Sequence, residues 1–395
     1  MALGTPGGKG LDLEEALKAY FWEAGYFVVR GVPFRLDGED VTDIDLWLYE
    51  RPAALTRRRL IVDAKNRRSP KVSERIIWAR GLRAALGVDG AIVATTDQRP
   101  TARSLAKALN VVLLGGEAVT KLMHSEQLNK GDQLRSQELD QAVKRVDESR
   151  RSSEWRQKLR DAREALISGM GAQSANSNLT ISGYFAEHTV AAQPRSEQAQ
   201  VALRLFYLTS ALAAISLDFA LADQAFRPHE ERRRAIIKSI RIGEAEGVAI
   251  LPTVRAAIGL ARKYADNGAA VAKQIEYGFN GDAERVPAET IADYVARISG
   301  SDALFNISRE LERASSSIEL PGFDDLSSEA KSLLGVFLDF NGISREKVAE
   351  AWPRKARGPV EKSAVASVAK TGPLFAGGEG RVGSEAPGGK DPQEV

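Results

Sequence analysis

The order of helix-like and strand-like segments in the first 122 residues constrains the fold of this chain more than any other feature. Apolar residues recur at helical spacing from Leu13 to Ala24, and three short runs rich in Val, Ile and Leu follow directly. Strands are predicted at 26–31, 42–50, 58–65, 90–96 and 111–114, with helices at 69–86, at 100–109 and after 115. Three consecutive strands suit antiparallel pairing, whereas strands separated by helices suit parallel pairing. The sequence therefore predicts a mixed α/β sheet with an αβββαβ core.

The rest of the chain has a different pattern. Residues 1–122 are predicted to form the α/β domain, and residues 123–165 are predicted to form a charged, exposed helical connector. Residues 166–355 are predicted to form an all-α domain of unknown role, with a loop at 169–180. Residues 356–395 are rich in Pro, Gly and Lys, which predicts a disordered tail.

Composition excludes several kinds of site. The chain has no cysteine and three scattered histidines, so disulfides, thiolate zinc sites and cysteine nucleophiles are excluded. A metal site would need oxygen ligands, which suit Mg²⁺ or Mn²⁺. The longest apolar stretch, 205–222, contains Asp218 and follows Arg204, so we expect a buried central helix and no membrane span. No secretory signal is visible at the start of the sequence, which predicts a cytoplasmic protein.

Charged side chains interrupt two of the predicted strands. "TDIDLWLYE" at 42–50 contains Asp45, and "LIVDAKN" at 60–66 contains Asp63 and Lys65. Residues two apart in a strand face the same side, so Asp63 and Lys65 point together, as do Asp43 and Asp45. Neighbouring strands would bring Asp45, Asp63 and Lys65 to one end of the sheet. Two carboxylates and a lysine suit metal-assisted cleavage of a phosphodiester.

These motifs resemble the PD-(D/E)XK nuclease superfamily. "TDID" matches the first acid and "VDAK" the (D/E)xK half, while residues 11–122 follow its αβββαβ core. "GAIVATTDQRPTARSLAKALNVVLLGGEAV" is similar to the end of the Mrr-type restriction endonuclease domain, and the segment is also similar to Holliday-junction resolvases. The resemblance implies a restriction-endonuclease-like fold and Mg²⁺-dependent cleavage, with Mn²⁺ as a possible substitute.

The resemblance also implies roles for individual residues. Asp45, Asp63, Lys65 and Glu14 are the expected catalytic residues, and the expected metal contacts are Asp45, Asp63, Glu14 and Ala64. Two choices stay open: Asp43 competes with Asp45, and Glu15 competes with Glu14, although Glu15 fits better as a helix cap. The alternative for Asp63 and Lys65 is an ordinary ion pair.

A basic segment follows the first carboxylate strand. Between Arg51 and Arg83 there are eleven Lys or Arg residues against two acids, as a phosphate-binding surface or a solvated helix face would have. The residues expected to contact nucleic acid are Asn66, Arg67, Arg68 and Gln98. The expected partner is DNA, and RNA is not distinguished from it.

Three functions follow from these patterns. The first is a Mg²⁺-dependent DNA endonuclease, by family analogy an effector of restriction or phage defence in bacteria. The second is a Holliday-junction or repair nuclease. The third is a nuclease fold without catalysis that acts as a scaffold, with the helical domain binding a protein partner or a second copy. A set of Glu14, Asp45, Asp63 and Lys65 that does not converge in space would favour the third.

Overall fold

The structure of the protein is a computed structural model. This structure describes residues 8–65, 72–96, 99–124, 132–224, 226–243 and 250–352. The chain divides into a compact unit from Met1 to Arg354 and a second unit from Lys355 to Val395. All described residues belong to the first unit, so the predicted tail at 356–395 lies outside them.

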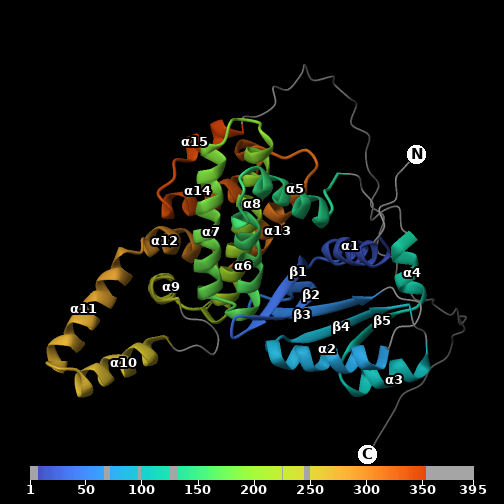
Figure 1. The fold of residues 1–395 in the computed structure, drawn as a ribbon, viewed down its shortest axis with the longest axis horizontal. Coiled ribbons are helices and arrows are strands. Elements are labelled where there is room, and N and C mark those ends of the chain that lie inside the picture. Colours follow the sequence, from blue (N-terminus) through green and yellow to red (C-terminus); the bar gives the residue numbers. More distant parts are fainter. Residues whose placement is uncertain are drawn as a thin grey trace, which may run out of the picture. The chain divides into compact units, whose positions relative to one another are not determined.

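A mixed five-stranded sheet forms the N-terminal part, as predicted (Figure 1). Its strands, in the spatial order β1-β2-β3-β4-β5, are β1 Phe27–Leu36, β2 Glu39–Glu50, β3 Arg58–Lys65, β4 Gly90–Thr95 and β5 Val112–Gly115. The first three pair antiparallel, and β3, β4 and β5 pair parallel. Asp37 and Gly38 both have positive φ, at 50° and 86°, which is the geometry of a two-residue hairpin turn. That tight turn lets β1 and β2 run longer than the sequence predicts.

Helices cover both faces of the sheet. Helix α1 Gly8–Glu23 and helix α4 Glu117–His124 pack on one face through apolar residues such as Leu17 and Val119. Helix α2 Val72–Leu86 and helix α3 Pro100–Ala108 pack on the other face, where Ile76 lies in the core with Ile61 and Val93. Successive residues of β3 and β4 belong in turn to the two cores, because neighbouring residues of a strand point to opposite sides of the sheet.

The second face of the sheet continues into the helical part of the chain. Trp47 and Tyr49 of β2 are fully buried, and the ring of Tyr49 contacts the rings of Phe219 and Phe305. One buried cluster therefore runs from Phe27 in β1 to helices near the end of the described chain. The predicted boundary at residue 122 crosses this continuous core.

Eleven helices and two short 3-10 turns form the rest of the described chain. The helices are α5 Ser136–Ser149, α6 Glu154–Ser168, α7 Ala172–Ala191, α8 Glu197–Ala220, α9 His229–Ile242, α10 Ile250–Tyr264, α11 Gly268–Arg285, α12 Ala288–Ile298, α13 Ala303–Ser316, α14 Ser328–Phe340 and α15 Arg345–Ala351. The 3-10 turns are Ala222–Gln224 and Phe323–Asp325. Helix α8 is long and apolar enough to cross a membrane, but 94% of its most apolar stretch is buried inside the protein. It is therefore the central core helix that the sequence predicts.

Two predictions about this region are wrong. The segment predicted as an exposed connector forms α5 and α6, whose residues Val143, Trp155 and Leu159 are buried. Each of these helices is amphipathic. The charged residues lie on one side and the apolar residues on the other, so the high charge of the segment does not mean that the whole helix is exposed. The segment predicted as a loop at 169–180 contains the start of α7. Its Ser174 hydroxyl lies 2.8 Å from the hydroxyl of Ser216 in α8, so small polar residues serve close helix packing here.

Candidate functional site

The two strand carboxylates lie where β2 and β3 separate. The β2–β3 pairing ends at Leu46 and Val62, so Asp45 and Asp63 are the next residues on each strand. Beyond that point β2 still pairs with β1, and β3 still pairs with β4 up to Lys65 and Thr95. The sheet thus opens into a fork between β2 and β3, with Asp45 and Asp63 at its start. The two residues therefore lie on adjacent strands, each one position beyond the last β2–β3 pair.

Asp45 is held in place by the backbone of the opposite strand. Its Oδ2 atom accepts a hydrogen bond of 2.7 Å from the backbone N–H of Ala64. This bond uses a donor that the β2–β3 pairing no longer satisfies. The Ala64 side chain is buried in the core, so only its backbone carbonyl could serve the predicted metal contact. Asp43, the competing acid, is exposed. It lies opposite Pro33 in the β1–β2 pairing, on the part of β2 that no longer pairs with β3.

Asp63 is partly buried and has one satisfied oxygen. Its Oδ1 atom forms an ion pair with the guanidinium of Arg75, which lies in the first turn of α2. Its Oδ2 atom is buried and has no hydrogen-bond partner among the described residues. An unsatisfied buried carboxylate oxygen is costly, and this is the kind of atom that a cation or a water would satisfy.

Arg75 was not predicted as part of the site. Burial lowers the pKa of its guanidinium, and the negative charge of Asp45 opposes that shift. Arg75 therefore supplies positive charge to both carboxylates of the fork. The sequence carries a signal for it, since Arg75 shares a helix face with buried Ala79 and Leu86. A basic residue on the apolar face of a helix needs a buried partner.

Glu14 lies close enough to the fork for its charge to matter. Burial raises the pKa of Glu14, the Arg30 guanidinium opposes the rise, and the charge of Asp45 adds to it. The carboxylate of Glu14 lies 2.8 Å from the Arg30 Nη2 atom. Glu15 instead accepts a hydrogen bond of 3.0 Å from the backbone N–H of Ser136, so its interpretation as a helix cap is wrong. Of the two glutamates, Glu14 is the one coupled to Asp45.

The remaining predicted residues are only partly described. The backbone of Lys65 belongs to β3, but its side chain lies outside the described part of the structure. Asn66, Arg67, Arg68 and Gln98, the predicted nucleic-acid contacts, also lie outside the described residues. Within the described ranges, no group of three or more His, Asp or Glu side chains is placed to hold one metal ion.

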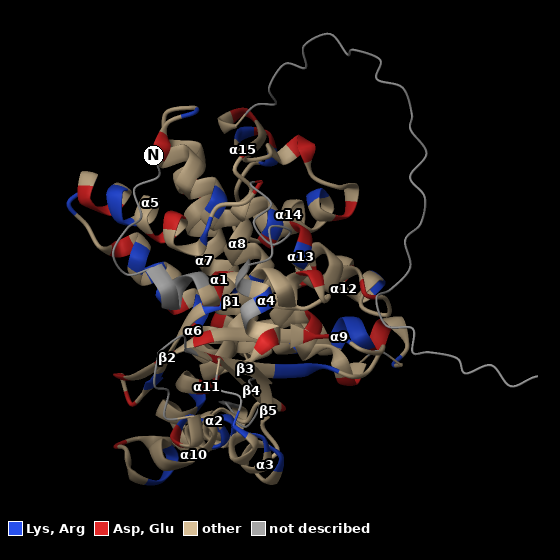
Figure 2. Ribbon diagram, turned by 90° about the vertical axis from the view of Figure 1, so that its right-hand side faces the viewer, with Lys and Arg blue, Asp and Glu red and all other residues tan. Residues whose placement is uncertain are grey.

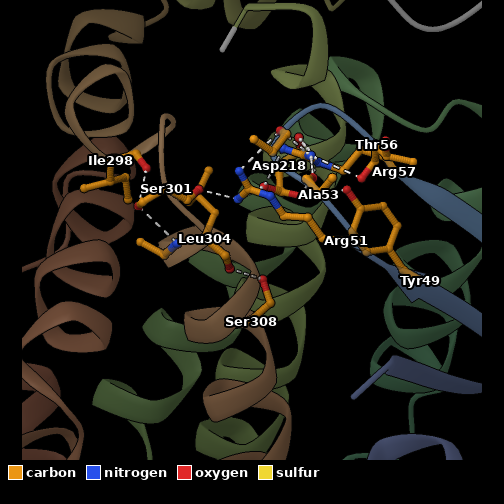
Figure 3. Close-up of polar contacts among 12 residues, drawn as sticks. Tyr49, Arg51, Ala53, Thr56, Arg57, Asp218, Ile298, Ser301, Leu304 and Ser308 are labelled. Atoms are coloured by element: carbon orange, nitrogen blue, oxygen red, sulfur yellow. Dashed lines mark hydrogen bonds and ion pairs between the residues drawn. The ribbon is translucent and has the colours of Figure 1, made fainter. Parts of the chain in front are cut away.

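Part of the predicted basic surface is used inside the protein. Arg51 and Arg57 have side chains that are 4% and 3% exposed, and both contact the carboxylate of Asp218 in α8 (Figure 3). Arg59 donates to the backbone carbonyl of Gly87 and lies over the ring of Phe219. In the coloured parts of the ribbon, Lys and Arg are interspersed with Asp and Glu on the helices (Figure 2). Three of the eleven basic residues between Arg51 and Arg83 thus stabilise the fold and are not available to bind phosphate.

These three arginines belong to a junction between the sheet and the helices. The hydroxyl of Tyr49 donates to Asp218 Oδ2 at 2.7 Å, and the Nη1 atom of Arg51 donates to Oδ1 at 3.0 Å. Arg51 also donates to the backbone carbonyl of Ser301, which precedes α13 (Figure 3). One carboxylate thus ties β2, the β2–β3 connection and two helical segments together.

Comparison with known proteins adds no assignment, because no family model, curated protein or solved structure matches this chain. The function must therefore be inferred from the fork itself. Two acids, a third acid coupled to them and a neighbouring cation can bind a divalent ion in place of that cation, or can form a closed set of internal ion pairs.

Proposed function

We propose that this chain is a Mg²⁺-dependent endonuclease that cleaves DNA at the fork between β2 and β3. The observation that carries the proposal is the position of Asp45 and Asp63 on adjacent strands at the point where their pairing stops. This position agrees with the "TDID" and "VDAK" motifs and with the resemblance to the PD-(D/E)XK superfamily. The mixed sheet with α1 on one face and α2 on the other supports the same proposal.

The fork suits a hard divalent cation. Its potential ligands are carboxylate and carbonyl oxygens, which Mg²⁺ and Mn²⁺ prefer. The buried Oδ2 atom of Asp63 has no described partner and would gain one on metal binding. Asp45, Asp63, Glu14 and the carbonyl of Ala64 would hold the ion, and Arg75 would release Asp63. When bound, the ion polarises the scissile phosphate and lowers the pKa of a bound water.

The chain's own groups have distinct tasks in this proposal. The N–H of Ala64 orients Asp45, so this carboxylate keeps its position without the ion. Burial raises the pKa of Glu14, so this carboxylate accepts a proton more readily than a glutamate in water does. Lys65 is assigned, by its place in the motif, to orient the attacking water or to stabilise charge on the phosphate. Asn66, Arg67 and Arg68, which follow β3 in the sequence, are the residues that we expect to contact the DNA backbone.

The biological setting follows from the family analogy. Cleavage of foreign DNA in the cytoplasm by a restriction or phage-defence effector is the first form of the proposal. Cleavage of Holliday junctions or damaged DNA is the second form. Branched and linear substrates distinguish them.

One observation favours a function without catalysis. Asp63 is paired with Arg75, and Glu14 is paired with Arg30, so two of the three acids are already neutralised by arginine. No described group of three acidic or histidine side chains is arranged around a shared metal position. A scaffold that keeps the fold would have these properties, with the helical part binding a partner.

A cleavage assay on the full chain decides between the two. Supercoiled, linear, single-stranded and four-way-junction DNA would be incubated with Mg²⁺, Mn²⁺ or EDTA, and Lys65→Ala, Asp63→Asn and Asp43→Asn would be compared. We expect cleavage that stops in EDTA and is lost in Lys65→Ala and Asp63→Asn. Asp43→Asn is the control, because it removes an exposed carboxylate from β2, the strand that also carries Asp45, and it should cut normally.

Thermal unfolding of the same variants is also measured, to give their melting temperatures. Lys65→Ala should keep the wild-type melting temperature, which separates loss of chemistry from loss of fold. A Lys65→Ala protein that cuts at the wild-type rate would end the nuclease proposal. Absence of cleavage by the wild type with every substrate and metal, combined with a lower melting temperature of Asp63→Asn, would establish the scaffold.

A further inference from the structure

Helices α10 and α11 form a two-helix arm that has almost no core. The arm extends away from the helices that surround α8 (Figure 1). Of residues 251–285, only Gly268 and Ala272 are buried, and both are small. Isolated helices of about 15 residues are marginal in water, and most helices gain stability by packing an apolar face. This arm therefore lacks the burial that normally stabilises helices of its length.

Large apolar side chains are exposed on the arm. Leu260 is 59% exposed, Tyr264 is 70% exposed and Tyr277 is 82% exposed. Leu260 and Tyr264 are four residues apart, so they lie on one side of α10. Exposed tyrosines are typical anchors of protein interfaces, because the ring buries apolar area at a small cost in side-chain entropy. These side chains indicate a surface that another molecule covers.

Two glycines in the arm also indicate that another molecule covers it. Gly259 lies inside α10 and Gly278 lies inside α11, and a Cβ added at either would meet no described atom within 4 Å. Glycine destabilises a helix interior relative to alanine, so internal packing does not account for these two residues. Gly278 directly follows Tyr277. A helix of another molecule could approach α11 closely at this point, which a side chain would prevent.

The charges of the arm indicate which molecule covers it. The tip is basic, with Arg262, Lys263 and Lys273 against Asp266, whereas the second half of α11 has Glu276, Asp282 and Glu284 against Arg285. Two arms side by side in the same direction would bring two basic tips together. Two arms in opposite directions would place each tip beside the acidic half of the other α11. With five basic and four acidic residues at 250–285, the arm lacks the net positive charge of a DNA-binding element.

The size of the arm is sufficient for a self-association surface. Helix α11 has 18 residues. At 1.5 Å per residue and about 10 Å per helix, one face of the arm measures roughly 27 Å by 20 Å, or about 1,100 Å² for two copies. Specific interfaces begin at about 1,000 Å².

We propose that the arm is a dimerisation element, and that two copies of this chain pair their α10–α11 arms in opposite directions about a two-fold axis. The pair would form a four-helix arrangement in which Leu260, Tyr264 and Tyr277 are buried between the copies. An isologous contact of this kind closes on itself and gives a dimer. The proposal does not depend on whether the fork cleaves DNA.

The test measures the mass of the full chain in solution. Sedimentation equilibrium over a range of concentrations would give the dimer dissociation constant of the wild type and of Tyr277→Ala, Gly278→Leu, Lys263→Glu and Glu284→Lys. We expect a dimer whose dissociation constant rises at least about tenfold in Tyr277→Ala, since a buried aromatic anchor is lost. Gly278→Leu should weaken the dimer while leaving the helix content unchanged or higher, because leucine favours a helix more than glycine does.

The charge variants test the direction of pairing. Lys263→Glu and Glu284→Lys should each weaken the dimer, and the double variant should recover most of the loss, because it exchanges the charges across an antiparallel pair. Glu148→Lys, which changes an exposed glutamate on α5, is the control and should have no effect. A wild type that is monomeric at all concentrations would overturn the proposal, as would a dimer that none of these changes weakens. A monomer that loses DNA binding in Lys263→Glu would assign the arm to nucleic acid instead.

Discussion

Asp218 gives the sharpest test of how the sheet is attached to the helices. Its side chain is 2% exposed, and it accepts from the hydroxyl of Tyr49 and from the guanidinium groups of Arg51 and Arg57. The closest of these contacts are 2.7 Å, from Tyr49 and from the Nε atom of Arg57. Replacing Asp218 by Asn keeps the shape but removes the only charge that is shown to balance these two buried arginines in the described structure.

The expected loss is large. Removing one partner of a buried ion pair costs about 3–5 kcal/mol, because the other charge stays buried without compensation. A domain is stable by only about 5–15 kcal/mol in total. Tyr49→Phe is the matched comparison, since it removes one hydrogen bond to a charged acceptor, worth about 1.5–3 kcal/mol, and leaves both arginines paired. We therefore expect Asp218→Asn to be the more destabilising of the two.

Urea unfolding provides the measurement. Circular dichroism at 222 nm would follow the helices, and fluorescence would follow the five tryptophans, of which Trp47 in the sheet and Trp155 in α6 are fully buried. Because one core joins the sheet and the helices, both signals should change in a single transition, and Asp218→Asn should shift that transition as a whole. A loss below about 1 kcal/mol, or two separate transitions of which only one moves, would refute the reasoning.

Two further outcomes are expected. Since burial raises the pKa of Glu14, the folded chain binds its proton more tightly than the unfolded chain, so the stability from this group is present below the unfolded pKa and is lost as the pH rises through the folded value. Glu14→Gln should therefore gain stability relative to wild type in urea titrations as the pH rises above about 4.5, and a difference that stays constant with pH would contradict this. A fragment that ends at residue 124 would expose Trp47 and Tyr49, which the helices cover, so we expect it to bind a hydrophobic dye and to melt without a sharp transition. A cooperative melt of that fragment would restore the boundary at 122.

The sequence by itself determined the local structure of the α/β part. The consecutive pairing of the first three strands, the parallel pairing of the later strands and the helix between β3 and β4 follow from residue periodicity and connection lengths. The placement of Asp45 and Asp63 on neighbouring strands also follows, because a short connection joins the two strands. These features depend on residues that are close together in the sequence, so they can be predicted from the sequence alone.

Only the tertiary structure decided which charges serve the fold and which belong to the site. Arg57 and Asp218 are 161 residues apart, and no local pattern indicates that they pair. Arg75 reaches Asp63 only because α2 folds back over the face of the sheet. Glu15 lies inside α1 and accepts a hydrogen bond from the N–H of Ser136, which is 121 residues away. The packing of α5, α6 and α7 was missed for the same reason, since an amphipathic or small-residue helix looks exposed until its partner is known. Burial and charge pairing are properties of residues brought together by the chain as a whole, and these set the environment of the fork.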